Sequence, residues 1–281
     1  MKLQARNSTL DLSVPQVMGI LNITPDSFSD GGCYNTFNAA ISHTEKMIKD
    51  GATIIDIGGE SSRPGAGIVS VEEELHRVIP IVEAVAKRFD VWISVDTSRP
   101  EVIREASAAG MHLINDIRAL SVPGAPEAAA ETGLPVCLMH MQGQPANMQK
   151  GPVYDDVVAE VSLFFSQRIQ SCLNGGIKRE NIILDPGLGF GKTLSHNYQL
   201  LHCLDYFKRY ELPLLVGMSR KSMIGLLLNN ADTAHRLNGT IASSVIAAMK
   251  GAHIIRVHDV KETYEALQIL RATVEHCNNI S

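Results

Sequence analysis

Polar residues that can bind or catalyse follow eight short apolar runs of this 281-residue chain. The runs cover residues 17–21, 53–55, 91–95, 112–114, 136–139, 182–184, 214–217 and 253–255. In chain order, the polar residues at or near their ends are Asn22, Asp56, Asp96, Asn115, His140, Asp185, Ser219 and Arg256. Carboxylates, amides and a guanidinium gathered in one place would hold a polar ligand in a fixed orientation.

Asp96 and Asp185 are the main candidates for ligand contacts. A carboxylate that faces the inside of a fold is costly unless a partner or a ligand satisfies it. Its two oxygens suit a guanidine-like edge with an N–H beside an amino group, and pterins and purines carry such an edge. Asn115 can offer a donor and an acceptor to the same heterocycle. The alternative for Asp96 is structural, because Asp96-Thr97-Ser98 also fits a helix N-cap cluster.

Two cationic clusters follow the seventh and eighth runs. Residues 218–222 (MSRKS) open a predicted helix, and positive charge added to a helix N-terminus makes an anion site. Period-2 alternation puts Arg256 and His258 on one face. The two clusters predict a phosphorylated ligand. The alternative for residues 218–222 is a serine N-cap with two solvated cations.

The glycine-rich stretch at residues 185–193 (DPGLGFGKT) does not fit a nucleotide-binding loop. A P-loop has four residues between its first glycine and Gly-Lys-Thr, whereas Gly187 and Gly191 enclose three. The Gly-x-Gly-x-x-Gly pattern fails because Lys192 occupies its final position. Three glycines around Phe190 would instead let that ring approach a flat ligand closely.

Metal binding is predicted at one position only. No spacing of His, Cys and Asp resembles a zinc site, and His140 at a strand end is at least as often structural as catalytic. Asn22, together with Asp26 or Asp30, could hold Mg²⁺, which prefers a few protein oxygens plus phosphate. Asp26 also fits an ordinary turn residue after Pro25.

The eight runs alternate with stretches of helical periodicity, which predicts an α/β fold of the (β/α)8 TIM-barrel type. Chemistry in this fold sits at the C-terminal ends of the strands. The length favours a single domain over residues 1–281, and residues 3–12 predict a short N-terminal hairpin that closes the barrel floor. Five glycines before strands are expected at positive φ, namely Gly51, Gly110, Gly133, Gly175 and Gly251.

Composition excludes several classes of protein. The net charge of −5 gives no reason to expect nucleic acid or an anionic membrane as partner. No apolar run is long enough for a membrane helix. Five cysteines without a Cys-x-x-Cys pair favour reduced thiols and a cytoplasmic location. Two long loops, at about residues 23–37 and 58–70, are expected to be functional loops over the barrel mouth.

Taken together, these features resemble the bacterial dihydropteroate synthases, most closely the enterobacterial forms, over essentially the whole chain. Any one motif is weak, but their combination in this order is specific. The motifs are residues 19–32 (GILNITPDSFSDGG), 58–65 (GGESSRPG), 95–97 (VDT), 115–116 (ND), 185–187 (DPG), 219–222 (SRKS) and 256–259 (RVHD).

The resemblance implies a transferase that joins 6-hydroxymethyl-7,8-dihydropterin diphosphate to p-aminobenzoate, with Mg²⁺ as cofactor, sulfonamides as competitors and a homodimer as assembly. It implies pterin contacts from Asp96, Asn115, Met139, Asp185, Phe190 and Lys221. It implies diphosphate contacts from Asn22 (also the metal ligand), Arg63, Arg256 and His258. The p-aminobenzoate pocket would comprise Phe28, Ser62, Arg63, Pro64 and Ser222. The implied catalytic residues are Asp96, Asp185, Lys221, Arg256 and His258.

Two positions depart from the family pattern: Ser62 stands where the family often has Thr, and Leu188 where close relatives have Phe.

Three other functions compete with synthesis of dihydropteroate. A corrinoid-dependent methyl-transfer barrel should lack the residue 219–222 cluster and the first long loop, and both are present. A non-catalytic pterin binder would be expected to have lost Asp30 or Arg63. An aldolase would need a Schiff-base lysine at a strand end, whereas Lys221 opens a helix.

Overall fold

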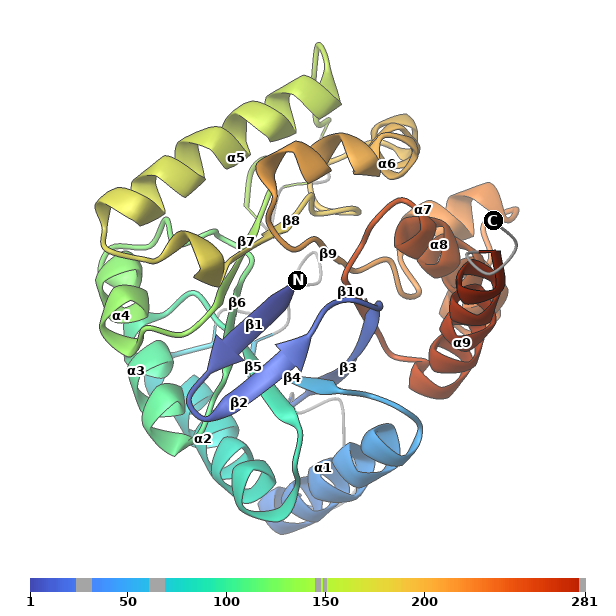
Figure 1. The fold of residues 1–281 in the computed structure, drawn as a ribbon. Helices are drawn as coiled ribbons and strands as arrows, with labels where there is room; N and C mark the ends of the chain where they lie inside the picture. The colour runs from blue at the N-terminus through green and yellow to red at the C-terminus, as the bar shows by residue number, and fades with distance from the viewer. Residues whose placement is uncertain (24–31, 61–68, 145–147, 149–150, 278–281) are drawn as a thin grey trace.

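Eight parallel strands form the centre of the computed structural model, which describes residues 1–23, 32–60, 69–144, 148 and 151–277. Their order in the sheet is β8-β7-β6-β5-β4-β3-β10-β9. A parallel bridge between Leu184 and Leu214 joins the two edges and closes the ring (Figure 1). The strands are β3 (Gln16–Asn22), β4 (Ile54–Gly58), β5 (Trp92–Asp96), β6 (Leu113–Asp116), β7 (Val136–Met139), β8 (Ile182–Asp185), β9 (Leu215–Val216) and β10 (Ile254–Val257).

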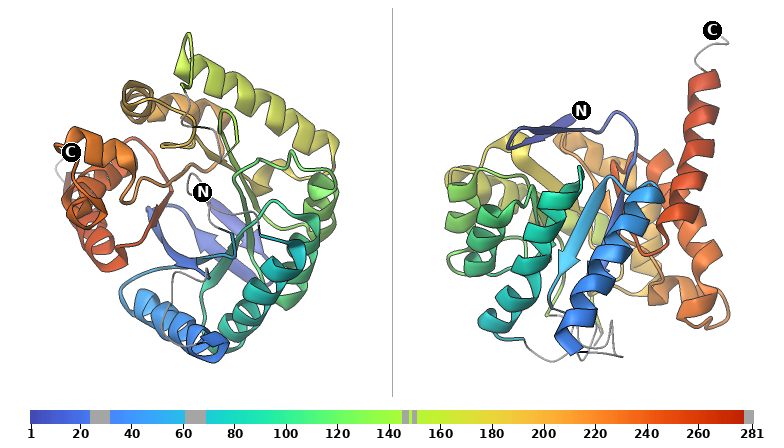
Figure 2. Two further views of the ribbon diagram at one scale, coloured as in Figure 1. Left: turned by 180° about the vertical axis from the view of Figure 1, so that it is seen from behind. Right: turned by 90° about the horizontal axis from the view of Figure 1, so that it is seen from below.

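Helices surround the ring, as the predicted (β/α)8 barrel requires (Figures 1 and 2). In α2 (Val71–Arg88) the buried residues Val78, Ile81, Val82 and Val85 form the apolar stripe expected of a helix that packs on a sheet. No helix within the described ranges is long and apolar enough to cross a membrane. The helices are α1 (Gly32–Lys49), α2 (Val71–Arg88), α3 (Pro100–Ala109), α4 (Ala125–Thr132), α5 (Val157–Asn174), α6 (Leu194–His202), α7 (Ser222–Leu227), α8 (Leu237–Met249) and α9 (Val260–Cys277), with short 3-10 turns η2 (Arg179–Asn181), η3 (Leu204–Tyr210) and η4 (Thr233–His235).

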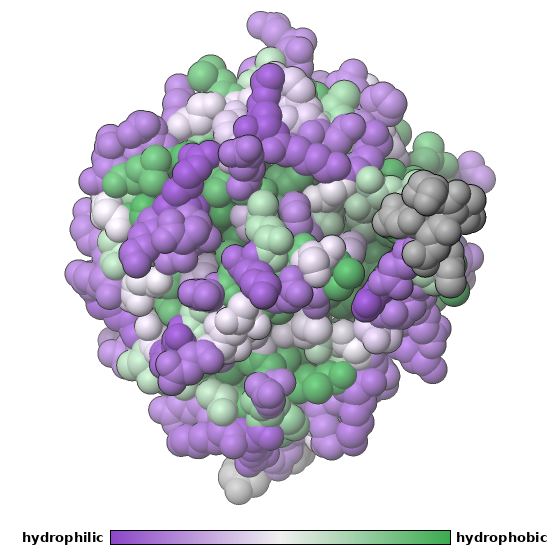
Figure 3. Space-filling model, viewed as in Figure 1, coloured by the Kyte–Doolittle hydropathy of each residue, from purple (hydrophilic) through white to green (hydrophobic). Residues whose placement is uncertain are grey.

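The predicted N-terminal hairpin is confirmed. β1 (Lys2–Ala5) and β2 (Ser8–Asp11) pair antiparallel across the end of the barrel where the strands begin (Figure 2). Trp92 Nε1 donates to Ser8 Oγ at 2.8 Å, and the indole stacks on the His112 ring with centroids 5.5 Å apart. The same end in space-filling view has a hydrophilic rim with hydrophobic residues in the hollows between (Figure 3). The hairpin thus closes the floor and leaves the opposite end for ligands.

The glycine prediction is correct at four of its five positions. Gly51, Gly110, Gly133 and Gly251 have φ of 106°, 123°, 64° and 102°. At the end of α5, Gly175 has φ −80° and the positive φ of 88° falls on Gly176. The helical turn extends one residue further than expected, because Gly175 N–H still bonds to Ser171 O at 3.0 Å.

Removing the Ser8 hydroxyl tests how firmly the hairpin is attached. Ser8→Ala leaves the indole N–H of Trp92 without its acceptor, and we expect a loss of about 1 kcal/mol in the free energy of unfolding. The chain has a single tryptophan, so its emission reports the same contact directly. Urea unfolding of Ser8→Ala is compared with that of Ser121→Ala at an exposed position. Unchanged stability together with unchanged emission would contradict this attachment.

Candidate active site

A guanidinium from β10 lies between two carboxylates from β4 and β5 inside the barrel. Arg256 Nε donates to Asp56 Oδ2 at 2.6 Å, and Arg256 Nη2 donates to Asp96 Oδ2 at 3.1 Å. Asp56 is fully buried and also accepts from Ser94 Oγ at 2.6 Å and from Asn115 Nδ2 at 3.0 Å. A buried charge is tolerated when it is paired and hydrogen-bonded this completely. The cluster therefore fixes Asp96, Asn115 and Arg256 relative to one another.

Asp56 was expected at the end of its strand with the other polar residues of the mouth, without a specific ligand role. β4 continues two residues further, to Gly58, so Asp56 lies within the barrel rather than at its mouth. Its partner in β5 is Ser94, two residues before Asp96. Arg256 was likewise expected after its strand and lies within β10. The sequence did contain a signal for this position: a carboxylate within a β-branched run. Charged residues are almost never fully buried without a partner, so such a carboxylate indicates a buried ion pair.

Four of the predicted pterin contacts come from adjacent strands. Asp96 in β5 pairs with Asn115 in β6, and Met139 in β7 pairs with Asp185 in β8. Asn115, Met139 and Asp185 are buried, and the Asp96 side chain is 15% exposed. The N-cap alternative for Asp96 is wrong, because the N-cap position of α3 is Arg99. Two carboxylates and one amide thus lie along one side of the barrel mouth.

Burial raises the pKa of both carboxyl groups. For Asp96, burial raises the pKa to about 7, although the nearby Arg256 cation acts in the opposite direction. For Asp185, burial again raises the pKa, while Lys221 and the backbone N–H of Gly187, 2.7 Å away, lower it. Each carboxyl group would therefore gain a stable ionised form when a ligand donates hydrogen bonds to it.

Lys221 and Phe190 meet beside Asp185. Lys221 Nζ lies 4.4 Å from the centroid of the Phe190 ring and donates to the carbonyl of Leu188. Burial lowers the pKa of Lys221 to about 8, and Asp185 opposes that effect. The interpretation of Lys221 as a solvated cation is therefore wrong. A flat ligand lying on Phe190 would have an ammonium group within reach.

The loops after β9 and β10 are tied together at the mouth. Ser219 Oγ lies 2.9 Å from His258 Nδ1 and accepts the backbone N–H of His258 at 3.1 Å. Arg220 has a φ of 58° and forms an ion pair with Asp259, while 40% of its side chain remains exposed. The loop that carries Lys221 is thus held against the loop that follows Arg256.

The remaining predicted residues lie at the rim or outside the described ranges. Asn22 ends β3 and is half-buried, and Ser222 is the exposed first residue of α7. The other predicted contacts and loop carboxylates lie outside the described residues: Asp26, Phe28, Asp30, Ser62, Arg63 and Pro64.

His140 is a structural residue here, and its partner was not anticipated. Its Nδ1 lies 3.0 Å from Lys192 Nζ, and its ring meets Phe164 edge-on with centroids 4.9 Å apart. Burial lowers the pKa of His140 to about 3 and that of Lys192 to about 7. Burial is the main cause of both shifts, and the nearby Lys192 ammonium lowers the pKa of His140 further, so the imidazole is neutral and can accept the hydrogen bond from Lys192.

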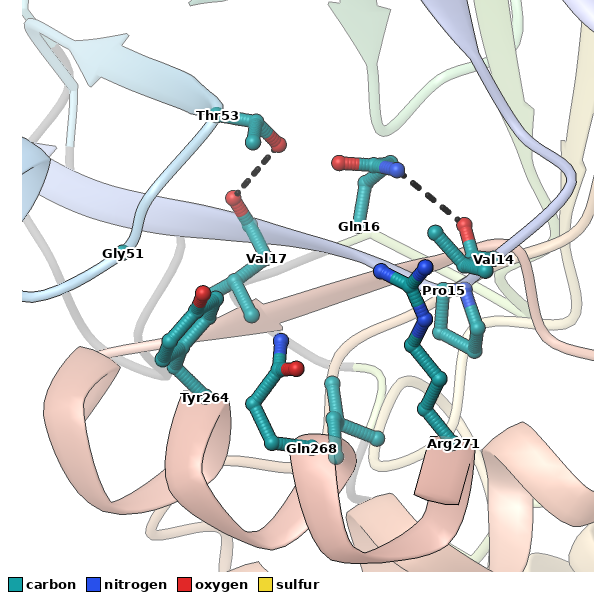
Figure 4. Close-up of a pocket in the computed structure, with 10 residues that line it drawn as sticks. Val14, Pro15, Gln16, Val17, Gly51, Thr53, Tyr264, Gln268 and Arg271 are labelled. Atoms are coloured by element: carbon teal, nitrogen blue, oxygen red, sulfur yellow. Dashed lines mark hydrogen bonds between the residues drawn. The ribbon is translucent and has the colours of Figure 1, made fainter. Parts of the chain in front are cut away.

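A cavity of about 210 Å³ lies at the far end of the barrel, between α9 and the start of β3 (Figure 4). Its polar lining is partly satisfied within the protein, since Gln16 Nε2 donates to Val14 O at 3.2 Å and Thr53 Oγ1 to Val17 O at 3.4 Å. No described residue of the predicted site lines this cavity. The candidate site is therefore the mouth and not this floor cavity.

Comparison with known proteins agrees with the geometry of the mouth. The family model of pterin binding enzymes matches residues 18–258. The chain belongs to this family of pterin-binding enzymes. The dihydropteroate synthase of Escherichia coli K12 is 65% identical over 99% of both chains, and that of Haemophilus influenzae is 56% identical over 97% of this chain and 99% of the relative. A Yersinia pestis dihydropteroate synthase crystallised with a sulfonamide drug complex has a TM-score of 0.94 at 62% identity, covering 98% of this chain and 100% of that one. Within the family, the chain is therefore one of the dihydropteroate synthases, which are transferases.

The raised pKa of Asp96 predicts a specific pH dependence of stability. Between about pH 4 and pH 7 the native carboxyl binds a proton that the unfolded chain has released, so its contribution to stability falls as the pH rises towards 7. Asp96→Asn removes this titration. Relative to the variant, the wild-type protein should lose on the order of 2 kcal/mol between pH 5 and pH 7.

Urea unfolding of both proteins at pH 5, 6, 7 and 8 measures the difference. Asp155→Asn, at an exposed position, is the matched control and should follow the wild-type profile. Parallel profiles for the wild-type protein and Asp96→Asn would show that Asp96 titrates as in the unfolded chain.

Proposed function

We propose that the chain condenses 6-hydroxymethyl-7,8-dihydropterin diphosphate with p-aminobenzoate to give 7,8-dihydropteroate and pyrophosphate. The observation that carries this proposal is the set of Asp96, Asn115 and Asp185 around Arg256, with Lys221 beside them. The three acceptor side chains suit the pterin edge, and the cations suit the diphosphate. Full-length relatives named for this activity support the same reaction.

The pterin would lie against Phe190 and Met139, with its hydrogen-bonding edge on Asp96, Asn115 and Asp185. Lys221 would donate to an acceptor of the same ring, because its ammonium already lies over Phe190. Binding of this edge would replace the proton that burial retains on Asp96 with hydrogen bonds from the ligand. The ionised carboxylate would then face the pterin.

The departing pyrophosphate would be held by Arg256, His258, Asn22 and Arg63. The described residues contain no group of three His, Cys, Asp or Glu side chains that could hold a metal by themselves. Asn22, with one amide oxygen at the end of β3, fits an ion that keeps phosphate and water as its other ligands. When bound, Mg²⁺ would supply charge neutralisation for the diphosphate.

Catalysis would consist mainly of charge stabilisation. The bond between the pterin methylene and the diphosphate oxygen breaks, its electron pair leaves with pyrophosphate, and the ring delocalises the resulting positive charge in an SN1-like step. Asp96, supported by Asp185, stabilises that charge, and Arg256 stabilises the leaving group. The neutral arylamine nitrogen then forms the new bond with its own lone pair, so attack needs no general base, and the ammonium that results passes its proton to water.

p-Aminobenzoate would enter last, between the two long loops. Phe28, Ser62, Arg63 and Pro64 would line its pocket, and its carboxylate would meet Ser222 at the start of α7. Sulfonamides, which a related Yersinia pestis structure contains, would compete for this pocket. Leu188, one of the two departures from the family pattern, is 1% exposed, so its side chain packs in the core while its carbonyl receives Lys221.

Pyrophosphate release from the dihydropterin diphosphate tests the proposal. Release should require Mg²⁺ and p-aminobenzoate and should yield dihydropteroate. A protein that binds the pterin without this turnover would instead be a non-catalytic pterin binder, the alternative that shares the same site.

Asp96→Asn and Arg256→Lys should each lower kcat by about a hundredfold or more, because each weakens charge stabilisation in the transition state. Arg256→Lys is preferred to alanine, since alanine would leave two buried carboxylates without a cation. Asp155→Asn serves as the control and should turn over normally. Near-normal turnover in both site variants would refute these roles.

We also propose that the chain forms a homodimer through its last helices. Several large apolar side chains are exposed on α7, α8 and α9, which lie together on one side of the barrel (Figure 1). These are Leu226, Leu227, Ile246, Met249, Ile269 and Val274. An apolar face of this kind favours association of two copies. The free thiols of Cys137, Cys172 and Cys203 fit a reducing compartment, and we place the enzyme in the cytoplasm.

Charge introduced into this face should separate the dimer. In the double variant Ile246→Glu, Met249→Glu two carboxylates would be buried at the interface, which is unfavourable without partners. Light scattering after size exclusion should give twice the chain mass for the wild-type protein and one chain mass for the variant. Leu163→Glu, an equally exposed apolar position on α5 across the barrel, should remain dimeric. A monomeric wild-type protein would end this proposal.

A further inference from the structure

The glycine-rich turn after β8 closes around the ammonium group of Lys192. Lys192 Nζ lies 2.9 Å from Gly187 O, 2.9 Å from Phe190 O and 3.0 Å from His140 Nδ1, with a longer contact of 3.3 Å to His140 O. The residue is 3% exposed. An ammonium has three protons, and here three acceptors lie within 3.0 Å. The cation is thus satisfied entirely by the turn and one neutral imidazole.

The glycines are what allow the turn to come this close. A Cβ at Gly187, which has φ +65°, would lie 1.9 Å from His140 O. A Cβ at Gly191, with φ +58°, would lie 2.3 Å from Gln142 O. Any other residue would push the turn away from residues 140–142 and so move its carbonyls away from Lys192. The glycine-rich stretch at residues 185–193, which does not fit a nucleotide-binding loop, therefore binds the ammonium group of its own Lys192.

This turn carries groups that the proposed reaction uses. Phe190 is one of its residues, and the Leu188 carbonyl receives the Lys221 ammonium. The backbone N–H of Gly187 donates to Asp185 Oδ1 at 2.7 Å. Displacement of the turn would therefore move the ring under the pterin and release two of its polar partners together.

We infer that Lys192 is a positioning residue for the pterin: it fixes the turn at residues 187–191 and thereby holds Phe190, Lys221 and Asp185 in their binding positions. This inference rests on the proposed function. Lys192 itself would not bind the ligand, because its protons are engaged by Gly187 O, Phe190 O and His140 Nδ1. Of the proposed diphosphate residues, Arg256 lies within β10 and His258 follows that strand, so both should be unaffected.

The test compares the binding of a pterin with the binding of pyrophosphate, without measuring turnover. Lys192→Met keeps the aliphatic stem and removes the three donors. The dissociation constant for 6-hydroxymethylpterin, measured by fluorescence, should rise about tenfold, as expected for loss of hydrogen bonds to a charged group. The dissociation constant for pyrophosphate with Mg²⁺, measured by calorimetry, should stay within about twofold of the wild-type value.

Asn181→Leu is the matched control, because Asn181 Nδ2 donates to Gly133 O at 2.8 Å at the opposite end of the barrel. It should leave both constants unchanged. His140→Phe is a second variant in case Lys192→Met does not fold: it keeps a ring beside Phe164 but removes one acceptor, and pterin binding should weaken by about threefold.

Unchanged pterin binding in Lys192→Met, or an equal loss of pterin and pyrophosphate binding, would overturn the positioning role while leaving the proposed function intact. If the wild-type protein binds no pterin, the proposed function fails, and the inference fails with it.

Discussion

The ion pair of Arg256 with Asp56 and Asp96 is the interaction on which the rest of the site depends. Charged groups inside a barrel are unfavourable unless each has partners, and this cluster supplies them from four different strands. Asp56, below the mouth, is bonded to three neighbours and so holds the guanidinium at a fixed height. Asp96, above it, shares the same cation but keeps part of its side chain accessible. One carboxylate is thus structural and the other is available to a ligand.

The different roles of Asp56 and Asp96 explain how one pocket can present both carboxylates and a guanidinium to a ligand. In the proposed binding mode, the pterin would meet the acceptors Asp96, Asn115 and Asp185, the diphosphate would meet donors, and Arg256 would lie between the two. Because hydrogen bonds within the protein hold this cluster together, the proposed reaction would need little reorganisation when charge develops. The neutral His140 and the enclosed Lys192 form a second such cluster, in which the Lys192 ammonium donates to the carbonyls of Gly187 and Phe190.

Much of this arrangement was predictable from the sequence, and the failures have physical causes. Asp96, Asn115 and Asp185 were found because apolar runs ending in polar residues mark the C-terminal ends of barrel strands. Asp56 was expected at the mouth and lies deeper, because depth in a barrel depends on how far each strand extends, and β4 continues to Gly58. Lys192 was missed because only the folded turn shows which carbonyls it meets. Ser62 and its neighbours lie outside the described residues, so the p-aminobenzoate pocket stays a prediction.

The barrel closes between β8 and β9 through few backbone contacts. β9 has two residues, and the edges meet through the Leu184–Leu214 bridge and the bond from Leu184 N–H to Pro213 O. Asp185 stands on one side of this seam and Lys221 on the other. A ligand that binds both residues would therefore cross-link the two edges of the barrel. Because such a ligand binds only the closed barrel, its binding would raise the free energy of opening at this point. Ligand binding at the mouth and closure of the barrel would in that case be linked equilibria.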